Sequence, residues 1–250
     1  MTLQSKVCFI TGGSSGIGAA AAREFARHGA EIVICGLPAD QALAQEVAAD
    51  IAAMGRKVLA IAADVSDPEQ ADRAVAQALQ EFGRLDVLLH CAGGAAPGGI
   101  FDVEPNTWYA AFDIHVHAIF HLVRAAAPSM ARNGGGAILL ISSAAGARGC
   151  AGAIAYGVVK GAIPQFTRAL ARELADQNIR VNCVSPGIIR TRFQNYLTPD
   201  QVRNNIQNRI PLHREGKPED VAHALAALAE NDFITGADVP IDGGMAMRMV

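Results

Sequence analysis

Short apolar runs alternate with long helix-like stretches along the whole chain. The runs are rich in β-branched residues and have no polar face, which is typical of a parallel sheet covered on both sides. The stretches between them, for example 40–54, 68–82 and 218–230, are rich in helix-forming residues. This order predicts a doubly wound α/β fold with right-handed crossovers. The seven expected strands are residues 7–10, 31–35, 57–61, 86–91, 137–141, 179–184 and 238–241.

The composition fits one domain, residues 1–250, with a large buried core. Apolar residues make up 51% of the chain and charged residues 18%, which argues against disorder. The formal net charge of −3 argues against nucleic-acid binding, which needs a basic stripe to displace counterions. Residues 190–214 form the least regular and most polar stretch, and we expect a mobile substrate flap there.

Cysteine use and hydropathy bear on the compartment and on assembly. The five cysteines form no C-x-x-C pair, so we expect free buried thiols in a reducing environment. The first seven residues carry no leader-like apolar stretch, and no run reaches the ~18 residues that a membrane span needs. We therefore expect a cytoplasmic protein with no membrane partner. A mean hydropathy of +0.21 indicates apolar surface buried between subunits.

A glycine-rich turn joins the first expected strand to a helix expected over 19–28. It reads Thr11-Gly12-Gly13-Ser14-Ser15-Gly16-Ile17-Gly18. Glycines at such a junction let the backbone approach a pyrophosphate and direct helix N–H groups at it. A tight turn needs glycine in any case, but the position at the first strand-to-helix junction favours a dinucleotide site.

Further motifs follow in order: Asp64-Val65, Ala92-Gly93, Ser142-Ser143, Tyr156-x-x-x-Lys160, Pro186-Gly187 with Thr191, and Asp242-Gly243-Gly244. Together with the T-G-x-x-x-G-x-G loop, this set resembles the short-chain dehydrogenase/reductase family over essentially the whole chain. The resemblance implies a Rossmann-type three-layer fold with a seven-stranded parallel sheet, and hydride transfer between nicotinamide C4 and a substrate carbon. It also implies that Thr191 and the backbone at Ile188 hold the carboxamide. The expected cofactor-binding residues are Thr11, Gly12, Ser14, Ser15, Gly16, Ile17, Gly18, Gly36, Leu37, Asp64, Val65, Ala92, Gly93, Tyr156, Lys160, Pro186, Gly187, Ile188 and Thr191.

Tyr156 and Lys160 lie one helical turn apart, so both side chains project from one helix face. A tyrosine hydroxyl, with an ordinary pKa of about 10, is a poor base at neutral pH, and a nearby ammonium lowers that pKa. Ser143 follows the fifth expected strand, at the sheet edge where open α/β sheets bind ligands. Ser142 is the alternative, but the family spacing matches Ser143. We predict a catalytic Ser143–Tyr156–Lys160 site, and the resemblance adds that Lys160 holds the nicotinamide ribose.

His115 stands where the family carries a fourth catalytic residue, an Asn that positions a relay water. Helical spacing places His115 on a stripe with Trp108, Phe112, Ile119 and Leu122, so it faces inward. It is either a packed, hydrogen-bonded core histidine or a contributor to proton relay, because imidazole both donates and accepts.

The family's N-N-A-G motif reads His90-Cys91-Ala92-Gly93 in this chain. The resemblance implies that the usual Asn side chains mainly tie strands together. Their replacement therefore puts the local geometry in question more than the chemistry.

The residues after the second strand bear on the choice of cofactor. An acidic residue at Gly36 would select NAD, whereas an Arg at Leu37 or a basic residue at Ser15 would pair with the 2′-phosphate of NADP. None of these is present. We expect NAD or NADP, with NAD favoured because no cation compensates a phosphate. Asp40 also discourages a phosphate, unless it only starts the next helix.

These features predict an NAD(P)-dependent oxidoreductase that interconverts a secondary alcohol and a ketone. The nearby charges, Arg148 and Arg190, either meet a substrate carboxylate or are solvated. The expected pocket walls are small or apolar and suit a small-molecule alcohol or ketone; they are 94–98, 144–154, 188–189, Phe193 and Tyr196.

Two other functions stay open at this stage. One is a 3-oxoacyl-carrier-protein reductase-like activity, for which Arg168 and Arg172 form either a landing patch or a solvated helix face. The other is a non-catalytic dinucleotide-binding protein.

The resemblance implies a homotetramer built through the two long helices around His115 and Tyr156. The ending 245–250 is short and apolar, and we expect it to pack in an interface.

Overall fold

The computed structural model describes residues 1–195 and 197–247. Within them, seven parallel strands form one sheet in the order β3-β2-β1-β4-β5-β6-β7. The order reverses between β1 and β4, which confirms the predicted doubly wound Rossmann-type α/β fold. The strands are β1 (Val7–Thr11), β2 (Glu31–Gly36), β3 (Val58–Ala62), β4 (Val87–His90), β5 (Gly136–Ile141), β6 (Ile179–Pro186) and β7 (Asp238–Ile241).

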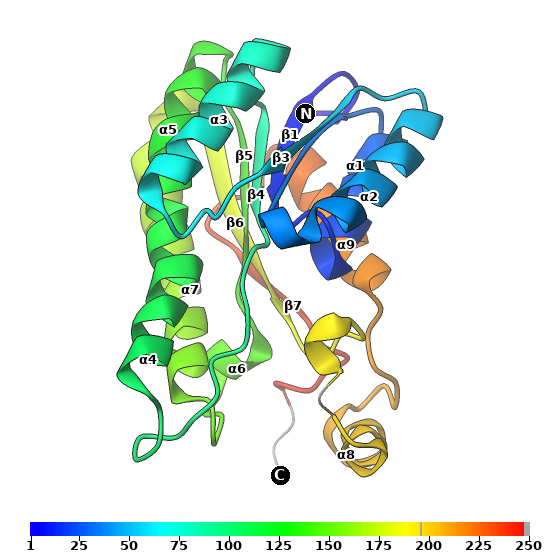
Figure 1. The fold of residues 1–250 in the computed structure, drawn as a ribbon, viewed down its shortest axis with the longest axis vertical. Helices are drawn as coiled ribbons and strands as arrows, with labels where there is room; N and C mark the ends of the chain where they lie inside the picture. Colours follow the sequence, from blue (N-terminus) through cyan, green and yellow to red (C-terminus); the bar gives the residue numbers. More distant parts are fainter. Residues whose placement is uncertain (196, 248–250) are drawn as a thin grey trace.

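Helices cover both faces of the sheet (Figure 1). One face carries α1 (Gly16–Arg27), α2 (Gln41–Ala53) and α9 (Pro218–Glu230). The other carries α3 (Pro68–Phe82), α5 (Ala118–Arg132) and α7 (Ile154–Leu174). The shorter α4 (Pro105–Phe112), α6 (Ala144–Ala147) and α8 (Pro199–Asn204) lie in the lower part of Figure 1, beyond the carboxyl ends of the strands. A π turn over Asp113–His117 joins α4 to α5.

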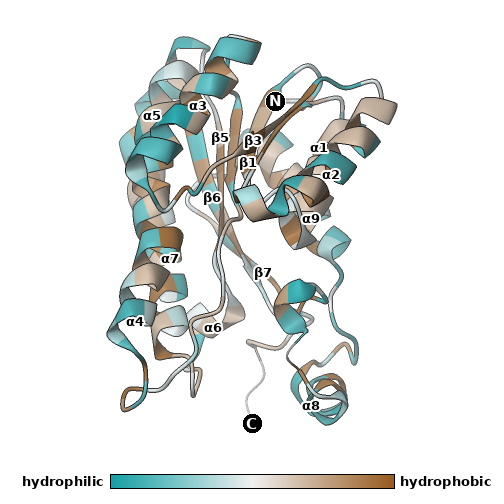
Figure 2. Ribbon diagram, viewed as in Figure 1, coloured by the Kyte–Doolittle hydropathy of each residue, from teal (hydrophilic) through white to brown (hydrophobic). Residues whose placement is uncertain are grey.

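The sheet is apolar because helices exclude water from both of its faces. All residues of β1, β4 and β6 are buried. Figure 2 shows the hydrophobic colouring concentrated on the central strands, with hydrophilic residues along the outer helix surfaces. The central apolar runs are therefore strands with two buried faces, as predicted, whereas the prediction is wrong for the edge strands β3 and β7, which keep exposed and half-buried residues because no further strand covers their outer edges.

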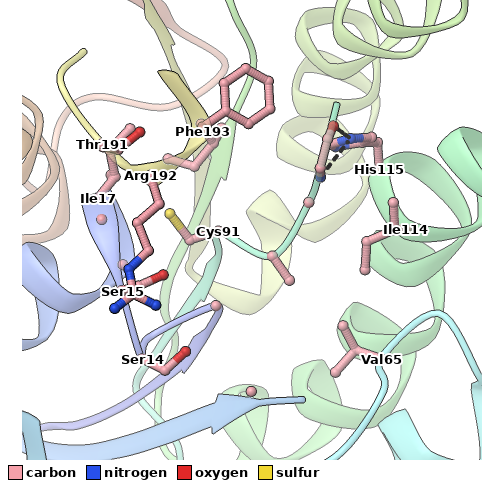
Figure 3. Close-up of a pocket in the computed structure, with 18 of the residues that line it drawn as sticks. Ser14, Ser15, Ile17, Val65, Cys91, Ile114, His115, Thr191, Arg192 and Phe193 are labelled. Carbon is pink, nitrogen blue, oxygen red and sulfur yellow. Dashed lines mark hydrogen bonds between the residues drawn. The ribbon is translucent and has the colours of Figure 1, made fainter. Parts of the chain in front are cut away.

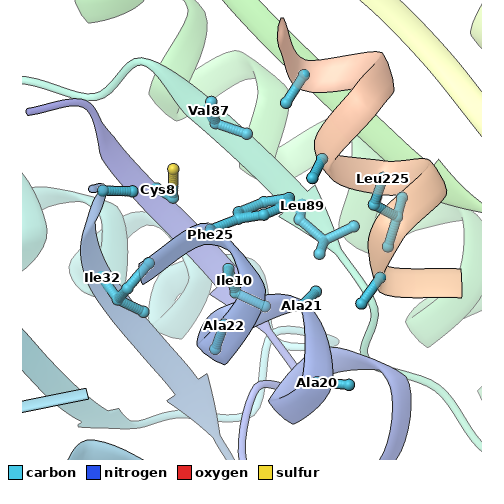
Figure 4. Packing of buried hydrophobic residues seen from close by; sticks show 14 of the residues in the cluster. Cys8, Ile10, Ala20, Ala21, Ala22, Phe25, Ile32, Val87, Leu89 and Leu225 are labelled. Atoms are coloured by element: carbon cyan, nitrogen blue, oxygen red, sulfur yellow. The ribbon is translucent and has the colours of Figure 1, made fainter. Parts of the chain in front are cut away.

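Small side chains bring α1 close to the sheet and to α9. Ala20, Ala21 and Ala22 of α1 are buried, and Phe25 of the same helix is fully buried. Figure 4 shows Phe25 beside Leu89 of β4, with Leu225 of α9 beyond Leu89. Burial of a Phe side chain of this kind stabilises the fold by roughly 1.5–3 kcal/mol. This packing holds the N-terminus of α1 at the carboxyl end of β1.

The predicted boundaries differ from the structure mainly around the glycine loop. The first helix begins at Gly16, three residues before the expected start at 19. Ser15 is extended and Gly16 has a positive φ of 54°, so the chain turns into the helix within the motif itself. The backbone N–H groups of the motif are consequently helix N-terminal groups.

The expectation of buried thiols is confirmed for Cys8, Cys35 and Cys183 and wrong for Cys150, which is exposed just after α6. Cys91 is half-buried. In the described ranges, no helix is long and apolar enough to cross a membrane. The same ranges contain no cluster of His, Cys, Asp and Glu suited to a metal ion.

Candidate active site

A cavity of about 740 Å³ opens at the carboxyl ends of the central strands. Figure 3 shows residues from the glycine loop, the π turn and the segment after β6 around it. Most of the predicted site residues line this cavity; they are Gly12, Ser14, Ser15, Gly16, Ile17, Gly18, Gly36, Leu37, Asp64, Val65, Ala92, Gly93, His115, Ser143, Tyr156, Lys160, Pro186, Gly187 and Thr191.

Two predicted cofactor contacts lie elsewhere. Thr11 is fully buried beneath the cavity floor, where its hydroxyl contacts the residues after β4. Ile188 lines an adjoining cavity, and its carbonyl accepts a hydrogen bond of 2.9 Å from the Gly216 N–H.

The glycine loop forms a cradle for an anion. A Cβ on Gly18 would overlap the Gly12 carbonyl, and a Cβ on Gly12 would lie only 2.8 Å from the Ala92 nitrogen. At the start of α1, the Ser15 side chain makes no capping hydrogen bond and the first turn contains no acidic residue. The first N–H groups of the helix therefore face the cavity uncapped. This arrangement fits the pyrophosphate of a dinucleotide, which these N–H groups and the helix dipole attract.

The end of the cavity beyond the glycine loop is lined by acidic side chains together with apolar ones. Gly36, Leu37 and Asp40 line it after β2, and Asp64 and Val65 line it after β3. The Asp64 carboxylate accepts hydrogen bonds from Ser66, at 3.0 Å from the backbone nitrogen and 2.6 Å from the hydroxyl. Its position is therefore well defined. Polar acceptors beside an apolar wall fit an adenosine moiety.

Lys160 is the buried cation of the site. Its Nζ donates a hydrogen bond of 2.8 Å to the Ile141 carbonyl at the end of β5 and lies 5.6 Å from the centre of the Tyr156 ring. Burial lowers the pKa of Lys160 to about 8. The predicted helical spacing thus places ammonium and phenol at the edge of one cavity.

The two serines after β5 have different surroundings. The Ser142 hydroxyl is buried and donates a hydrogen bond of 2.8 Å to the Lys160 carbonyl, which ties β5 to α7. The Ser143 hydroxyl lies at the N-terminus of α6 and accepts from the Ala145 N–H at 3.1 Å. Ser143 keeps its own hydroxyl proton available to donate toward the cavity. This geometry favours Ser143 over Ser142 as the residue that contacts a substrate.

Close backbone packing of α6 on α7 sets the position of these serines, and no motif of the sequence predicts it. A Cβ on Gly146 of α6 would lie 2.5 Å from the Lys160 carbonyl carbon and 2.7 Å from the Gly161 nitrogen. Glycine at 146 therefore allows α6 to rest directly on α7. The only sequence signal was a glycine inside an Ala-rich stretch.

His115 faces inward and is buried within the π turn, as its stripe predicts. Its Nε2 lies 3.0 Å from the Gly94 carbonyl, to which it donates when protonated. Burial, with a smaller effect of the Lys160 charge, lowers the pKa of His115 to about 2, so the ring is neutral. Its Nδ1 is buried without a hydrogen-bond partner in the described structure. The ring meets that of Tyr156 edge-on, with centroids 5.8 Å apart.

His90 replaces the missing Asn as a tie between elements. It is buried, with Nδ1 2.9 Å from the Thr11 hydroxyl and Nε2 2.9 Å from the Ile114 carbonyl. Burial lowers its pKa to about 4, which keeps the ring neutral. One imidazole thereby connects β4, β1 and the π turn. The signal that could have found it was a polar residue ending an apolar strand.

The segment 190–214 begins against the site. A Cβ on Gly16 would lie 3.3 Å from the Thr191 Cγ2, and the Phe193 ring lies 5.8 Å from that of Tyr156. Arg190 forms an ion pair with Glu215 and does not line the cavity. Tyr196, expected in the pocket wall, lies outside the described residues.

The chain end also contacts the loop after α6. The Arg148 guanidinium donates to the Ala246 carbonyl at 2.9 and 2.6 Å, so this side chain is engaged within its own subunit. Residues 248–250 of the expected interface tail lie outside the described residues.

A family model described as Enoyl-(Acyl carrier protein) reductase matches residues 12–246. The Serratia marcescens short-chain dehydrogenase/reductase superposes with a TM-score of 0.92 at 34% identity, covering 98% of this chain and 100% of that one. The chain belongs to the short-chain dehydrogenase/reductase family. It is an oxidoreductase that acts on CH–OH or keto groups with a nicotinamide cofactor, NAD or NADP.

Two other members show the range of the family around this chain. The 2,5-dichloro-2,5-cyclohexadiene-1,4-diol dehydrogenase of Sphingobium indicum is 37% identical over 247 residues, covering 98% of both chains. The 3-oxoacyl-[acyl-carrier-protein] reductase of Thermotoga maritima is 33% identical over 249 residues, covering 99% of this chain and 100% of that one. The expected family is confirmed, and the non-catalytic alternative gives way to an enzyme.

Proposed function

We propose that this enzyme is an NAD-dependent dehydrogenase/reductase for compact, largely apolar secondary alcohols and ketones, with Tyr156 as general acid/base. The observation that carries the proposal is the buried Lys160 ammonium, 5.6 Å from the Tyr156 ring in the cavity lined by the glycine loop. A cation in a site of low dielectric stabilises the phenolate strongly. The bound nicotinamide supplies or accepts the hydride.

Proton transfer at Tyr156 needs the substrate oxygen to be held. Ser143 lines the same cavity, and its hydroxyl accepts a hydrogen bond from Ala145, which leaves its proton for a substrate oxygen. Ser143 orients and polarises the carbonyl while Tyr156 donates its proton in reduction, or accepts one in oxidation. Lys160 also holds the nicotinamide ribose.

We propose that His115 contributes to the proton relay rather than only to packing. With Nε2–H donated to the Gly94 carbonyl, Nδ1 is an acceptor, and it is buried without a partner among the described residues. A water molecule fits such an orphaned acceptor. Because the pKa of His115 is lowered to about 2, the ring orients this water without becoming charged.

The adenosine end of the cavity supports NAD over NADP. Asp40 and Asp64 line that end together with Gly36 and Leu37, and the described lining residues after β2 and β3 include no Lys or Arg. A 2′-phosphate there would meet carboxylates and no cation from these two segments. A ribose 2′-hydroxyl, by contrast, can donate to a carboxylate.

The walls near Tyr156 support a compact apolar substrate. Ala110, Ile114 and Phe193 line this part of the cavity, and the nearby Arg148 and Arg190 are engaged by Ala246 and Glu215. Arg148 and Arg190 are therefore not available to a substrate carboxylate, and the side chain of Arg192 runs toward Ser15 of the glycine loop (Figure 3). A cyclic diol such as the one named for the Sphingobium relative has this character.

Carrier-protein thioester reduction is the second candidate, supported by the Thermotoga relative. Arg168 and Arg172 are exposed on α7, as a landing patch requires. Arg168, however, donates to its neighbour Gln165, at 3.2 and 2.9 Å, as an ordinary solvated helix residue does.

We also propose that the enzyme is a cytoplasmic homotetramer that uses residues 190–214 as a substrate flap. The exposed Phe120 of α5 lines an apolar hollow together with Phe166 and Leu170 of α7. Apolar surface of this kind on the two long helices supports their burial between subunits.

Titration of NADH and NADPH, followed by the fluorescence of the reduced nicotinamide, tests the cofactor assignment. We expect NADH to bind at least tenfold more tightly, and tighter binding of NADPH would contradict the assignment. A panel of cyclic secondary alcohols, cyclic ketones and acetoacetyl-CoA then separates the two substrate classes. A higher kcat/KM for the thioester than for any cyclic substrate would favour the carrier-protein reading.

A further inference from the structure

The cavity holds two cationic side chains among its described lining residues, Lys160 and Arg192. Lys160 is engaged, because its ammonium donates to the Ile141 carbonyl and faces Tyr156. The Arg192 carbonyl accepts a hydrogen bond from the Asn195 N–H within its own turn, whereas the exposed Arg192 side chain makes no hydrogen bond or ion pair with any described residue. A guanidinium has five N–H donors, so an unpaired one at the rim of a binding cavity is available to an anion.

Arg192 is directed at the glycine loop. It belongs to the short helical turn Arg192–Gln194 that follows β6. In Figure 3 its side chain runs from this turn toward Ser15, the residue that precedes α1. The preceding residue, Thr191, contacts the same place, since a Cβ on Gly16 would lie 3.3 Å from its Cγ2. The Thr191 side chain and the direction of the Arg192 side chain therefore both place this turn beside the start of α1.

A dinucleotide brings two negative charges to this loop. The described lining of the cavity already holds Asp40 and Asp64, and α1 provides only neutral N–H groups and its dipole. A helix N-terminus carries about half an elementary charge, which compensates the two phosphate charges only in part. A guanidinium placed across the phosphates from the helix supplies the rest through charge-assisted hydrogen bonds.

We propose that Arg192 binds the cofactor pyrophosphate from the side opposite the glycine loop. This inference rests on the proposed function, because it takes a nicotinamide dinucleotide as the ligand. It assigns the cation to the pyrophosphate and not to a 2′-phosphate, because the Thr191 side chain lies beside Gly16 at the start of α1, whereas a Cβ on Gly36 would meet only Ser14. Cofactor affinity then depends on this one side chain.

The test measures binding by calorimetry, without turnover. ADP-ribose carries the pyrophosphate but neither nicotinamide nor a 2′-phosphate, and adenosine carries no phosphate. We expect Arg192→Met to raise the Kd for ADP-ribose by about tenfold or more, the usual effect of removing a charged hydrogen bond. Binding of adenosine should not change. Arg192→Lys, which keeps the charge without the fork, should recover part of the loss.

Arg203→Met is the matched control. Arg203 lies in the same segment and is exposed, and Asp200, also exposed, is its one ion-pair partner among the described residues. The Arg203→Met variant loses the same charge from the same segment. An equal loss of ADP-ribose binding in this variant would mean that net charge alone causes the effect, and it would overturn the proposal. Raising the salt concentration should weaken ADP-ribose binding more steeply in the wild type than in Arg192→Met.

NADH and NADPH provide the remaining comparison. Arg192→Met should weaken both by the same factor, whereas a loss confined to NADPH would place the guanidinium at a 2′-phosphate and overturn the pyrophosphate assignment. Unchanged binding of all probes in Arg192→Met, with a wild type that binds them, would refute this inference alone. A wild type that binds none of the dinucleotides would refute the proposed function itself.

Discussion

Thr11 and His90 face each other across neighbouring strands β1 and β4, joined by a hydrogen bond of 2.9 Å between Oγ1 and Nδ1. The Ile114 carbonyl only accepts, so the Nε2 of His90 carries the proton and Nδ1 accepts from the Thr11 hydroxyl. The Thr11 oxygen in turn accepts from the N–H groups of Cys91 and Ala92, both at 3.1 Å. The chain of hydrogen bonds is complete from the cavity floor to the π turn.

Breaking this chain should cost stability. His90→Ala leaves the Thr11 hydroxyl proton without its acceptor and the Ile114 carbonyl without its imidazole donor, and it opens a void, so we expect a loss of about 2–4 kcal/mol in the free energy of unfolding. Thr11→Val, which keeps the shape and removes the hydroxyl, should cost about 1–2 kcal/mol. Urea denaturation of the single and double variants measures both. If the two losses simply add, the residues do not act through a shared hydrogen bond.

Two buried histidines should make the fold sensitive to acid. The pKa values of His90 and His115 are lowered by burial to about 4 and about 2, below the ordinary value of 6.5 in the unfolded chain. Between these values the unfolded chain binds more protons than the folded one, so stability is full above about pH 6.5 and falls as the pH drops below it. The loss at pH 5 is on the order of 2 kcal/mol per histidine.

The variant His115→Asn removes one of these titrating groups. Its free energy of unfolding should therefore fall less steeply than that of the wild type between pH 7 and pH 5. Equal slopes for the two proteins would contradict the neutral, buried state of His115.

Tyr156→Phe should lower kcat at least a thousandfold while the Kd for NADH stays within about threefold, because only the transferable proton is lost. Steady-state kinetics and cofactor titration separate the two effects. Lys160→Met should move the alkaline rise of kcat/KM to higher pH, since the phenolate loses its neighbouring cation. If the Tyr156→Phe variant kept a tenth of the wild-type activity, Tyr156 would not be the general acid/base.

Ser142 and Ser143 form a matched pair of neighbours with opposite expectations. Ser143→Ala should lower kcat by about a hundredfold and cost under 1 kcal/mol of stability, the part due to its cap on α6. Ser142→Ala leaves the Lys160 carbonyl without its 2.8 Å donor and should cost about 1–2 kcal/mol, with kcat changed less than tenfold. The reverse pattern in kinetics and urea denaturation would exchange their roles.

His115→Asn should retain or raise activity if His115 positions a relay water, because an amide also donates and accepts. His115→Leu, similar in bulk but without hydrogen bonds, should lower kcat about tenfold or more and preserve NADH binding. Equal kcat values for the Asn and Leu variants would mean that His115 contributes only to packing and takes no part in proton relay.

Local patterns carried most of the fold prediction. The positions of the apolar runs predicted all seven strands of the described sheet. A strand that is largely buried between two helix layers consists mainly of apolar residues, so it stands out from the polar segments on either side of it. The helix over Pro68–Phe82 was predicted to the residue, with Pro68 at its start and Gly83 just after its end. The start of α1 was missed because the glycine loop is itself the first turn of the helix, which helix propensity disfavours.

The sequence by itself determined the alternation of strands and helices, the glycine loop at Gly12–Gly18 and the spacing of Tyr156 and Lys160, since each depends on the pattern within one or two elements. Only the tertiary structure decided that His90 bonds Thr11, 79 positions away, and that Ser142 bonds the Lys160 carbonyl. It alone brought Arg192 into the cavity that holds the glycine loop. Hydrogen bonds and ion pairs act over about 3–4 Å, and folding, not sequence spacing, sets which distant groups come that close.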